Sequence, residues 1–226
     1  MTDTDFARRV EQLSGSAWPA IDQWLYDGWV LRFGRGYTKR VNSITPVDPG
    51  VRLLADKIAA CEAAYAARHV RPVFRLPSVA EPERLDAALA ERGYGKLDKT
   101  SVRLMPLDGA LPEAALPVEQ APALTPAWLD CAAAWNGLDR GQRGALEAII
   151  GRVAAPAAFA LARDGARPAA IGLAVLQDDF VCLTGIIADP GQRRRGFGRA
   201  VTVALLGWAR GRQARHAYLQ VVKSNK

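Results

Sequence analysis

The chain reads Gln192-Arg193-Arg194-Arg195-Gly196-Phe197-Gly198-Arg199 between a strand-like apolar run at 180–187 and a helix-like apolar run at 197–208. Gly196 and Gly198 have no side chain to keep a ligand off the backbone, and both tolerate positive φ. The first N–H groups of a helix lack internal partners and can point at phosphate oxygens, while arginines add charge and donors. The stretch therefore predicts a phosphate-binding turn whose ligand carries a pyrophosphate.

Apolar periodicity around this turn predicts an alternating order of elements. The expected elements are helices at 127–135 and 140–153, strands at 157–163, 169–176 and 180–187, a helix at 197–208 and a strand at 216–222. Thr125 is a plausible N-cap, with Pro126 at the first helical position.

The first half repeats the strand–helix–strand order. We expect strands at 27–33 and 37–45, a helix with Leu54, Ile58, Cys61 and Tyr65 on one face, a strand at 72–76, a helix at 82–92 and a strand at 100–105. Between its strand and helix stand two prolines, which lack amide donors, and a single arginine. This half is not expected to bind the same ligand.

Five prolines spread over residues 106–126 with little periodicity, which is typical of a linker. The sequence therefore predicts a domain at 1–107, a linker at 108–122 and a ligand-binding domain at 123–226.

Composition indicates a soluble, cytoplasmic protein. No apolar run is long enough to span a bilayer, and the N-terminus lacks the basic and apolar regions of a signal peptide. Cys61, Cys131 and Cys182 are read as reduced core thiols. With His69 and His216 as the two histidines and no ligand-like spacing, no metal site is expected.

The formal charge of +7 is compatible with a protein that binds nucleic acid. Many basic residues fall in the glycine turn and near the end of its helix, at Arg210, Arg212 and Arg215, and no aromatic residues interleave with them as base platforms. An anionic cofactor and a solvated surface are the preferred interpretation, with no nucleic-acid partner.

Residues 123–226 resemble the GNAT superfamily of acetyl-CoA-dependent N-acetyltransferases. The family's signature of Gln or Arg, two residues, Gly, one residue, then Gly or Ala is met by Arg193, Gly196 and Gly198. The resemblance implies an α/β (α+β) fold with a mixed, mostly antiparallel sheet flanked by helices. Residues 1–107 look like a degenerate GNAT-like domain, similar at 28–32, 38–43 and 85–94 to segments of tandem GNAT-like bacterial proteins.

The resemblance also implies a cofactor site for acetyl-CoA, a cosubstrate, without metal. In the family the strand before the turn is bulged and splays from the next strand, and the pantetheine arm pairs with its backbone. The site residues implied are Ile186, Ile187 and Ala188 for pantetheine, Arg193, Arg194, Arg195, Gly196, Phe197 and Gly198 for pyrophosphate, Arg199 as a further phosphate partner, and Asn225 near the cofactor.

No catalytic residue is assigned. The strand before the turn offers Cys182 and Thr184 but no carboxylate, which leaves a water chain or Asp178 or Asp179 as substitutes for a base. Cys182 is read as a core residue, and Tyr94 serves as an acid only if its half docks over the thioester.

The family continues past the final strand with a helix and two more strands, whereas this sequence ends at Lys226. A final strand without a partner would expose an edge. We expect a truncated or incomplete chain here, the alternatives being that another chain or the first half supplies the missing piece.

Two functions remain. The preferred one is an N-acetyltransferase acting on a small-molecule or peptide amine, away from membranes. The alternative is a non-catalytic acyl-CoA-binding or scaffold protein. The acceptor and the oligomeric state, a homodimer included, are not readable from the sequence.

Overall fold

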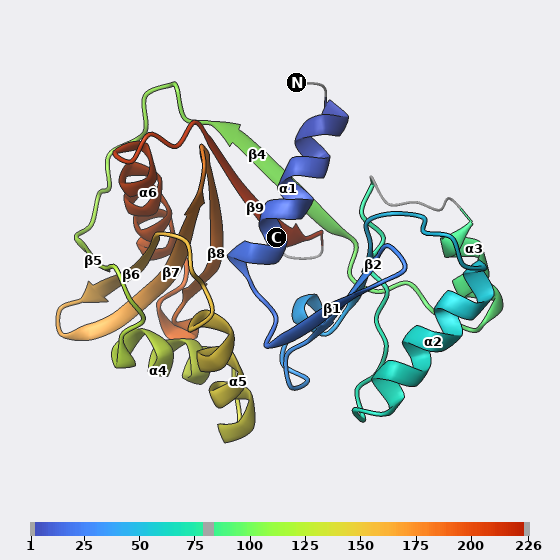
Figure 1. Ribbon diagram of the computed structural model, residues 1–226. Helices are drawn as coiled ribbons and strands as arrows, with labels where there is room; N and C mark the ends of the chain where they lie inside the picture. Colours follow the sequence, from blue (N-terminus) through green and yellow to red (C-terminus); the bar gives the residue numbers. More distant parts are fainter. Residues whose placement is uncertain (1–2, 79–83, 224–226) are drawn as a thin grey trace. The chain divides into compact units, whose positions relative to one another are not determined.

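A computed structural model describes residues 3–78 and 84–223. The chain divides into two compact units, unit 1 at Met1–Leu97 and unit 2 at Asp98–Lys226. Figure 1 labels most of the helices and strands of both units.

Unit 1 holds a small antiparallel sheet in the order β1-β2-β3. Its elements are α1 (Asp3–Ala17), β1 (Asp22–Tyr26), β2 (Trp29–Phe33), the 3₁₀ turn η1 (Lys39–Val41), β3 (Ile44–Pro46), α2 (Leu54–Ala66) and α3 (Leu85–Glu91). Asp27 and Gly28, at φ values of 45° and 81°, form the tight turn between β1 and β2. Phe74 pairs in parallel with Ile44, so a helix crosses between two parallel segments.

The core of unit 1 lies between the sheet and α2. Ile58, Cys61 and Tyr65 are fully buried against Trp29 and other apolar residues of β2, which confirms the predicted helical stripe. Burial raises the pKa of the Cys61 thiol to about 12, as expected for a core residue.

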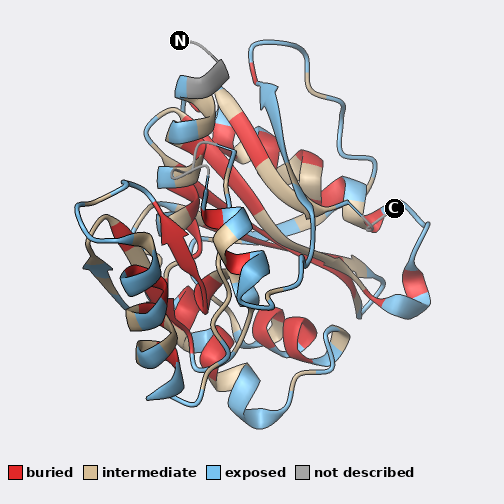
Figure 2. Ribbon diagram, turned by 90° about the vertical axis from the view of Figure 1, so that its right-hand side faces the viewer, coloured by how far each residue is buried: buried red, intermediate tan, exposed pale blue. Residues whose placement is uncertain are grey.

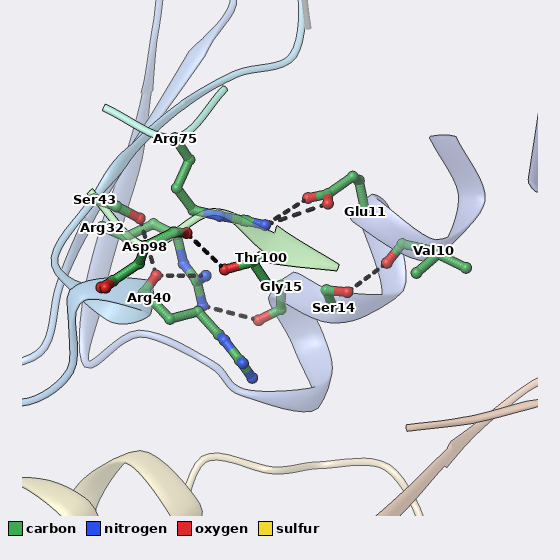
Figure 3. A network of polar contacts seen from close by, with 10 residues as sticks. All are labelled: Val10, Glu11, Ser14, Gly15, Arg32, Arg40, Ser43, Arg75, Asp98 and Thr100. Carbon is green, nitrogen blue, oxygen red and sulfur yellow. Dashed lines mark hydrogen bonds and ion pairs between the residues drawn. The ribbon is translucent and has the colours of Figure 1, made fainter. Parts of the chain in front are cut away.

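Polar contacts connect α1 to the rest of unit 1 (Figure 3). Glu11 pairs with Arg75 at 3.0 Å, and the guanidinium of Arg32 donates to the carbonyl oxygens of Gly15 and Arg40 at 3.0 and 3.2 Å. Arg32 is 3% exposed, and burial lowers its pKa to about 10. Carbonyl groups near the C-terminus of α1 thus stabilise a buried cation.

Unit 2 contains a six-stranded mixed sheet in the order β4-β9-β8-β7-β6-β5. Its elements are β4 (Thr100–Pro106), β5 (Val118–Ala121), α4 (Pro126–Trp135), α5 (Arg140–Ile150), β6 (Ala157–Asp164), β7 (Arg167–Gln177), β8 (Phe180–Ala188), the 3₁₀ turn η2 (Pro190–Gln192), α6 (Phe197–Arg210) and β9 (His216–Val222). All neighbours are antiparallel except β8 and β9, which are parallel. This confirms the predicted fold class.

Helices cover both faces of this sheet. Ala158, Ala160 and Ala162 of β6 pack with Val201 and Leu205 of α6. Because alternate residues of a strand point to opposite faces, Phe159 lies on the other face, where its ring meets Trp128 of α4 edge-on at 5.5 Å. The central strands and the inner sides of these helices are the buried parts of unit 2 (Figure 2).

Two expectations about the middle of the chain are wrong. β4, assigned to the first domain, pairs with β9 along its whole length, from Thr100↔Val222 to Pro106↔His216. The presumed linker at 108–122 contains β5, which pairs with β6. Leu111 and Leu116, which precede β5 in the same segment, pack against the core of unit 2. Both segments therefore belong to unit 2.

The first half also differs in detail from its predicted elements. Residues 37–45 form a turn around η1 and a short β3 in place of a long strand, and residues 72–76 contribute a single bridge at Phe74. The helix expected at 82–92 is seen as α3 from Leu85, and its first residues lie outside the described ranges. The tandem arrangement itself stays a prediction.

Candidate functional site

The strand before the glycine turn is bulged. Leu173 of β7 lies opposite Thr184, whereas Ile171 lies opposite Ile187. Two residues of β8, Gly185 and Ile186, therefore oppose the single residue Gly172, which is the definition of a β-bulge. Gly185 has a φ of 59°, a conformation that glycine adopts without strain. The expected bulge is confirmed.

Beyond the bulge, β8 separates from β9. Their parallel pairing runs from Phe180↔His216 to Leu183↔Leu219 and ends there, although β8 continues to Ala188 and β9 to Val222. The last residues of β9 pair with β4 on their other side. No strand in the described part of the chain pairs with this edge of residues 184–188, so the backbone groups that face it, away from β7, are available to an extended ligand.

Asp189 organises the turn that follows β8. Its carboxylate accepts hydrogen bonds from the Gly191 N–H at 2.9 Å and the Gln192 side-chain amide at 3.3 Å, and it pairs with Arg167 at 2.8 Å. The Gly191 N–H is the main reason that the pKa of Asp189 is lowered, with Gln192 and Arg167 adding to it. The carboxylate thus holds η2 in place before the basic residues begin.

The basic turn leads directly into α6. Gly196 is its N-cap, with a left-handed φ of 89°, and no side chain caps the helix. The backbone N–H groups from Arg193 to Arg199 donate no hydrogen bond to any residue that the structure describes. A Cβ built at Gly196 or Gly198 meets no described atom within 4 Å. The backbone here is open to a ligand and supplied with free donors, as an anion site requires.

The arginines of the turn are not equivalent. Within residues 3–78 and 84–223, Arg193, Arg194 and Arg199 form no ion pair, and all three are exposed. Arg195 instead donates to Asp164 at 2.7 Å and to the side-chain oxygen of Gln192 at 3.2 Å. Its guanidinium already has partners, so its contribution to a phosphate site is its backbone N–H.

Other predicted site residues have different surroundings. Phe197 is 5% exposed and belongs to the core, so it too offers its N–H group. Ile186, Ile187 and Ala188 are partly buried in the part of β8 that pairs with β7 but no longer with β9. Asn225 lies outside the described residues.

The start of α6 also lines a pocket of about 180 Å³. Its lining residues are Arg195, Gly196, Arg199, Ala200 and Val203 from the turn and α6, together with Glu113, Ala115 and Leu116. The segment misread as a linker therefore borders the candidate anion site.

The candidate bases lie away from the bulge. Asp178 and Asp179 form the turn before β8, at the opposite end of that strand, where Asp179 approaches His216 at 3.7 Å. At roughly 3.3 Å per residue they are about 20 Å from Gly185 along the strand. Cys182 is 4% exposed in the core, and Tyr94 donates its hydroxyl to Glu62 at 3.0 Å. Neither aspartate is placed to act at the bulge.

The corresponding turn in unit 1 is filled by the chain itself. The Asp27 carboxylate accepts the N–H groups of Val51 and Arg52 at 3.0 Å each, just before α2. The same carboxylate pairs at 3.2 Å with Lys57, whose side chain is 1% exposed. These contacts, the Val51 N–H foremost, lower the pKa of Asp27. An internal carboxylate occupies the donors that an external anion would need.

Neither a membrane-spanning helix nor a metal-binding cluster is found among the described residues. None of the helices in the described ranges is long and apolar enough to cross a membrane. Among the described residues, no group of three or more His, Cys, Asp or Glu side chains is arranged to hold a metal ion. All three cysteines are buried, as predicted, and none forms a disulfide among the described residues.

Comparison with known proteins identifies the family. A model described as "Probable histone acetyltransferase Rv0428c C-terminal" matches residues 4–226. The chain belongs to this family of GNAT N-acetyltransferases. The assignment to the acetyltransferases places the bulged strand and glycine turn in a family of enzymes.

Relatives agree with this assignment. "Uncharacterized N-acetyltransferase YobR" of Bacillus subtilis is 28% identical, with 98% of this chain and 90% of the relative covered. "Probable histone acetyltransferase Rv0428c" of Mycobacterium tuberculosis is 27% identical over 95% of this chain, which spans 65% of that relative's length.

A solved structure shows the same fold. The GCN5-related N-acetyltransferase from Kribbella flavida is 18% identical, covers 97% of this chain and 88% of its own, and has a TM-score of 0.69. At this identity the likeness concerns the fold.

Three residues that shape the site, Trp128, Gly172 and Gly185, were not predicted from the sequence. Trp128 donates its indole N–H to the Gly172 carbonyl at 3.0 Å, and it lies against Gly185. Isolated glycines within strand patterns are a signal for bulges and close approaches, and both Gly172 and Gly185 carried it. Nothing local to Trp128 indicated its partner 44 residues away.

Proposed function

We propose that this chain transfers an acetyl group from acetyl-CoA directly to an amine, and that unit 2 binds the cosubstrate. The observation that carries the proposal is the run of free N–H groups from Arg193 to Arg199, directly after a bulged strand with an unpaired edge. Free amides at a helix start suit a pyrophosphate, and an unpaired strand edge suits the amide groups of a pantetheine arm.

Different residues bind different parts of the cosubstrate. The backbone of Ile186, Ile187 and Ala188 pairs with pantetheine, and the turn amides hold the pyrophosphate. The exposed guanidinium groups of Arg194 and Arg199, which have no ion-pair partner among the described residues, pair with phosphate oxygens. No metal takes part.

The reaction forms a carbon–nitrogen bond and breaks the carbon–sulfur bond of the thioester. The amine must lose a proton, and the leaving thiolate must gain one. Since β8 carries no carboxylate and Asp178 and Asp179 lie at its far end, the amine proton leaves through water. The acceptor is a small-molecule or peptide amine, and three buried cysteines that form no disulfide among the described residues favour the reducing cytoplasm.

The test measures binding and turnover in the full chain. Calorimetry with CoA should give a saturable site, and thiol release from acetyl-CoA should rise with at least one amine. The panel should contain amino acids, polyamines and lysine peptides, the last because one relative is named a probable histone acetyltransferase. Tight CoA binding without turnover would favour a non-catalytic acyl-CoA-binding protein. Absence of CoA binding would contradict both functions.

A further inference from the structure

Trp128 contacts both strands at the bulge. Its indole N–H donates to the carbonyl oxygen of Gly172 in β7 at 3.0 Å. On β8, a Cβ built at Gly185 would lie 3.5 Å from Cζ2 and Cη2 of the same indole. One side chain therefore bonds the strand opposite the bulge and packs against the bulged residue itself.

The indole is held firmly where it is. Trp128 is 1% exposed, and its backbone N–H donates to the side-chain oxygen of Thr125, the N-cap of α4, at 3.2 Å. Phe159 meets its ring edge-on at 5.5 Å. Because such a side chain has little freedom to move, it fixes the positions of β7 and β8 relative to each other at the bulge.

The other face of the sheet leaves equally little room. A Cβ built at Gly172 would lie 2.6 Å from Val201 and 3.0 Å from Leu205, both on α6. The side chains of α6 therefore cover Gly172 on one face of the sheet. On the opposite face, Trp128 of α4 donates a hydrogen bond to the Gly172 carbonyl oxygen. Two glycines and one indole together define the geometry at which β8 leaves its regular register.

We infer that Trp128 is a positioning residue for the acyl-CoA arm. By fixing the bulge, it sets the direction of the backbone groups of Ile186, Ile187 and Ala188 that follow it. The inference rests on the proposed function, because it concerns how the same strand receives pantetheine. Recognition of the pantetheine arm then depends on Trp128, although Trp128 does not contact the arm.

The experiment compares two ligands in the full chain. CoA uses the strand edge and the turn, whereas ADP carries the pyrophosphate and has no pantetheine. Trp128→Phe removes the indole N–H and leaves the Gly172 carbonyl without that donor. We expect CoA affinity to fall roughly tenfold while ADP affinity stays within about twofold of the unaltered chain. Trp135→Phe, two turns further along α4, is the matched control and should change neither affinity.

A second variant addresses the same bulge with the indole intact. Gly185→Ala places a Cβ at a φ of 59° and against the indole, so it should disturb the bulge even if Trp128→Phe fails to fold. The same selective loss of CoA affinity is expected. Unchanged CoA affinity in both variants, or equal losses for CoA and ADP, would overturn the inference while leaving the proposed function standing. A chain that binds neither ligand contradicts the proposed function itself.

Discussion

At the scale of single residues, the glycine turn shows what a motif specifies and what it leaves open. The positions of Gly196 and Gly198 predicted an open backbone, and both positions have free space around them. The motif did not distinguish the arginines, although Arg195 is bonded to Asp164 while its neighbours are exposed. Side-chain partners from distant segments decide such roles, and a local pattern does not contain them.

The free space at Gly198 supports a direct test of the anion site. Gly198→Trp should place an indole beside the turn amides and lower CoA affinity by at least about tenfold, because the pyrophosphate loses its place. Gly207→Trp is the control: Gly207 is exposed on the same helix and equally free of neighbours. Both changes raise helix propensity, so both variants should fold. Equal CoA affinities by calorimetry would show that the anion site is elsewhere.

At the scale of elements, prediction succeeded where periodicity was strong. From α4 to β9 the expected helices and strands lie within a few residues of those observed, because amphipathic helices and apolar strands alternate there with clear turns. In unit 1 no helix or strand was predicted before Asp27. The stripe of Val10, Leu13 and Ala17 on α1 was a usable signal, as was the Asp27-Gly28 turn for β1.

The strand β4 was predicted with nearly correct bounds but assigned to the wrong sheet. A strand pattern reports burial and extension, whereas its partner is set by long-range pairing that a single sequence does not show. The finding removes the uncovered edge expected at β9, because β4 pairs with it throughout.

This pairing predicts where unit 2 can be divided. A fragment of residues 98–226 retains β4 and should melt in one cooperative transition as a monodisperse species. A fragment starting at residue 108 leaves the edge of β9 exposed and should aggregate or lose its transition. Circular dichroism and size-exclusion chromatography separate the two results. Similar behaviour of both fragments would mean that β4 contributes little to unit 2.

At the scale of the whole molecule, the two units share a local order of elements but differ in the turn before the helix. In each, a strand, a helix and a parallel segment follow in order, as β3, α2 and Phe74 in unit 1 and as β8, α6 and β9 in unit 2. The donors before α2 are taken by the Asp27 carboxylate, whereas those before α6 are free. The prolines noted in the sequence pointed to this difference, and the carboxylate supplies its physical basis.

The chain should therefore bind one CoA, and Asp27 should matter for stability alone. Asp27→Asn removes the charge that pairs with Lys57, a side chain 1% exposed, and should lower the melting temperature clearly. Asp56→Asn, an exposed change in the first turn of α2, is the control and should have little effect. Calorimetry should give one CoA per chain, with the same affinity, in all three proteins. Two bound CoA molecules, or a loss of CoA binding on changing Asp27, would show that the turn in unit 1 takes part in recognition after all.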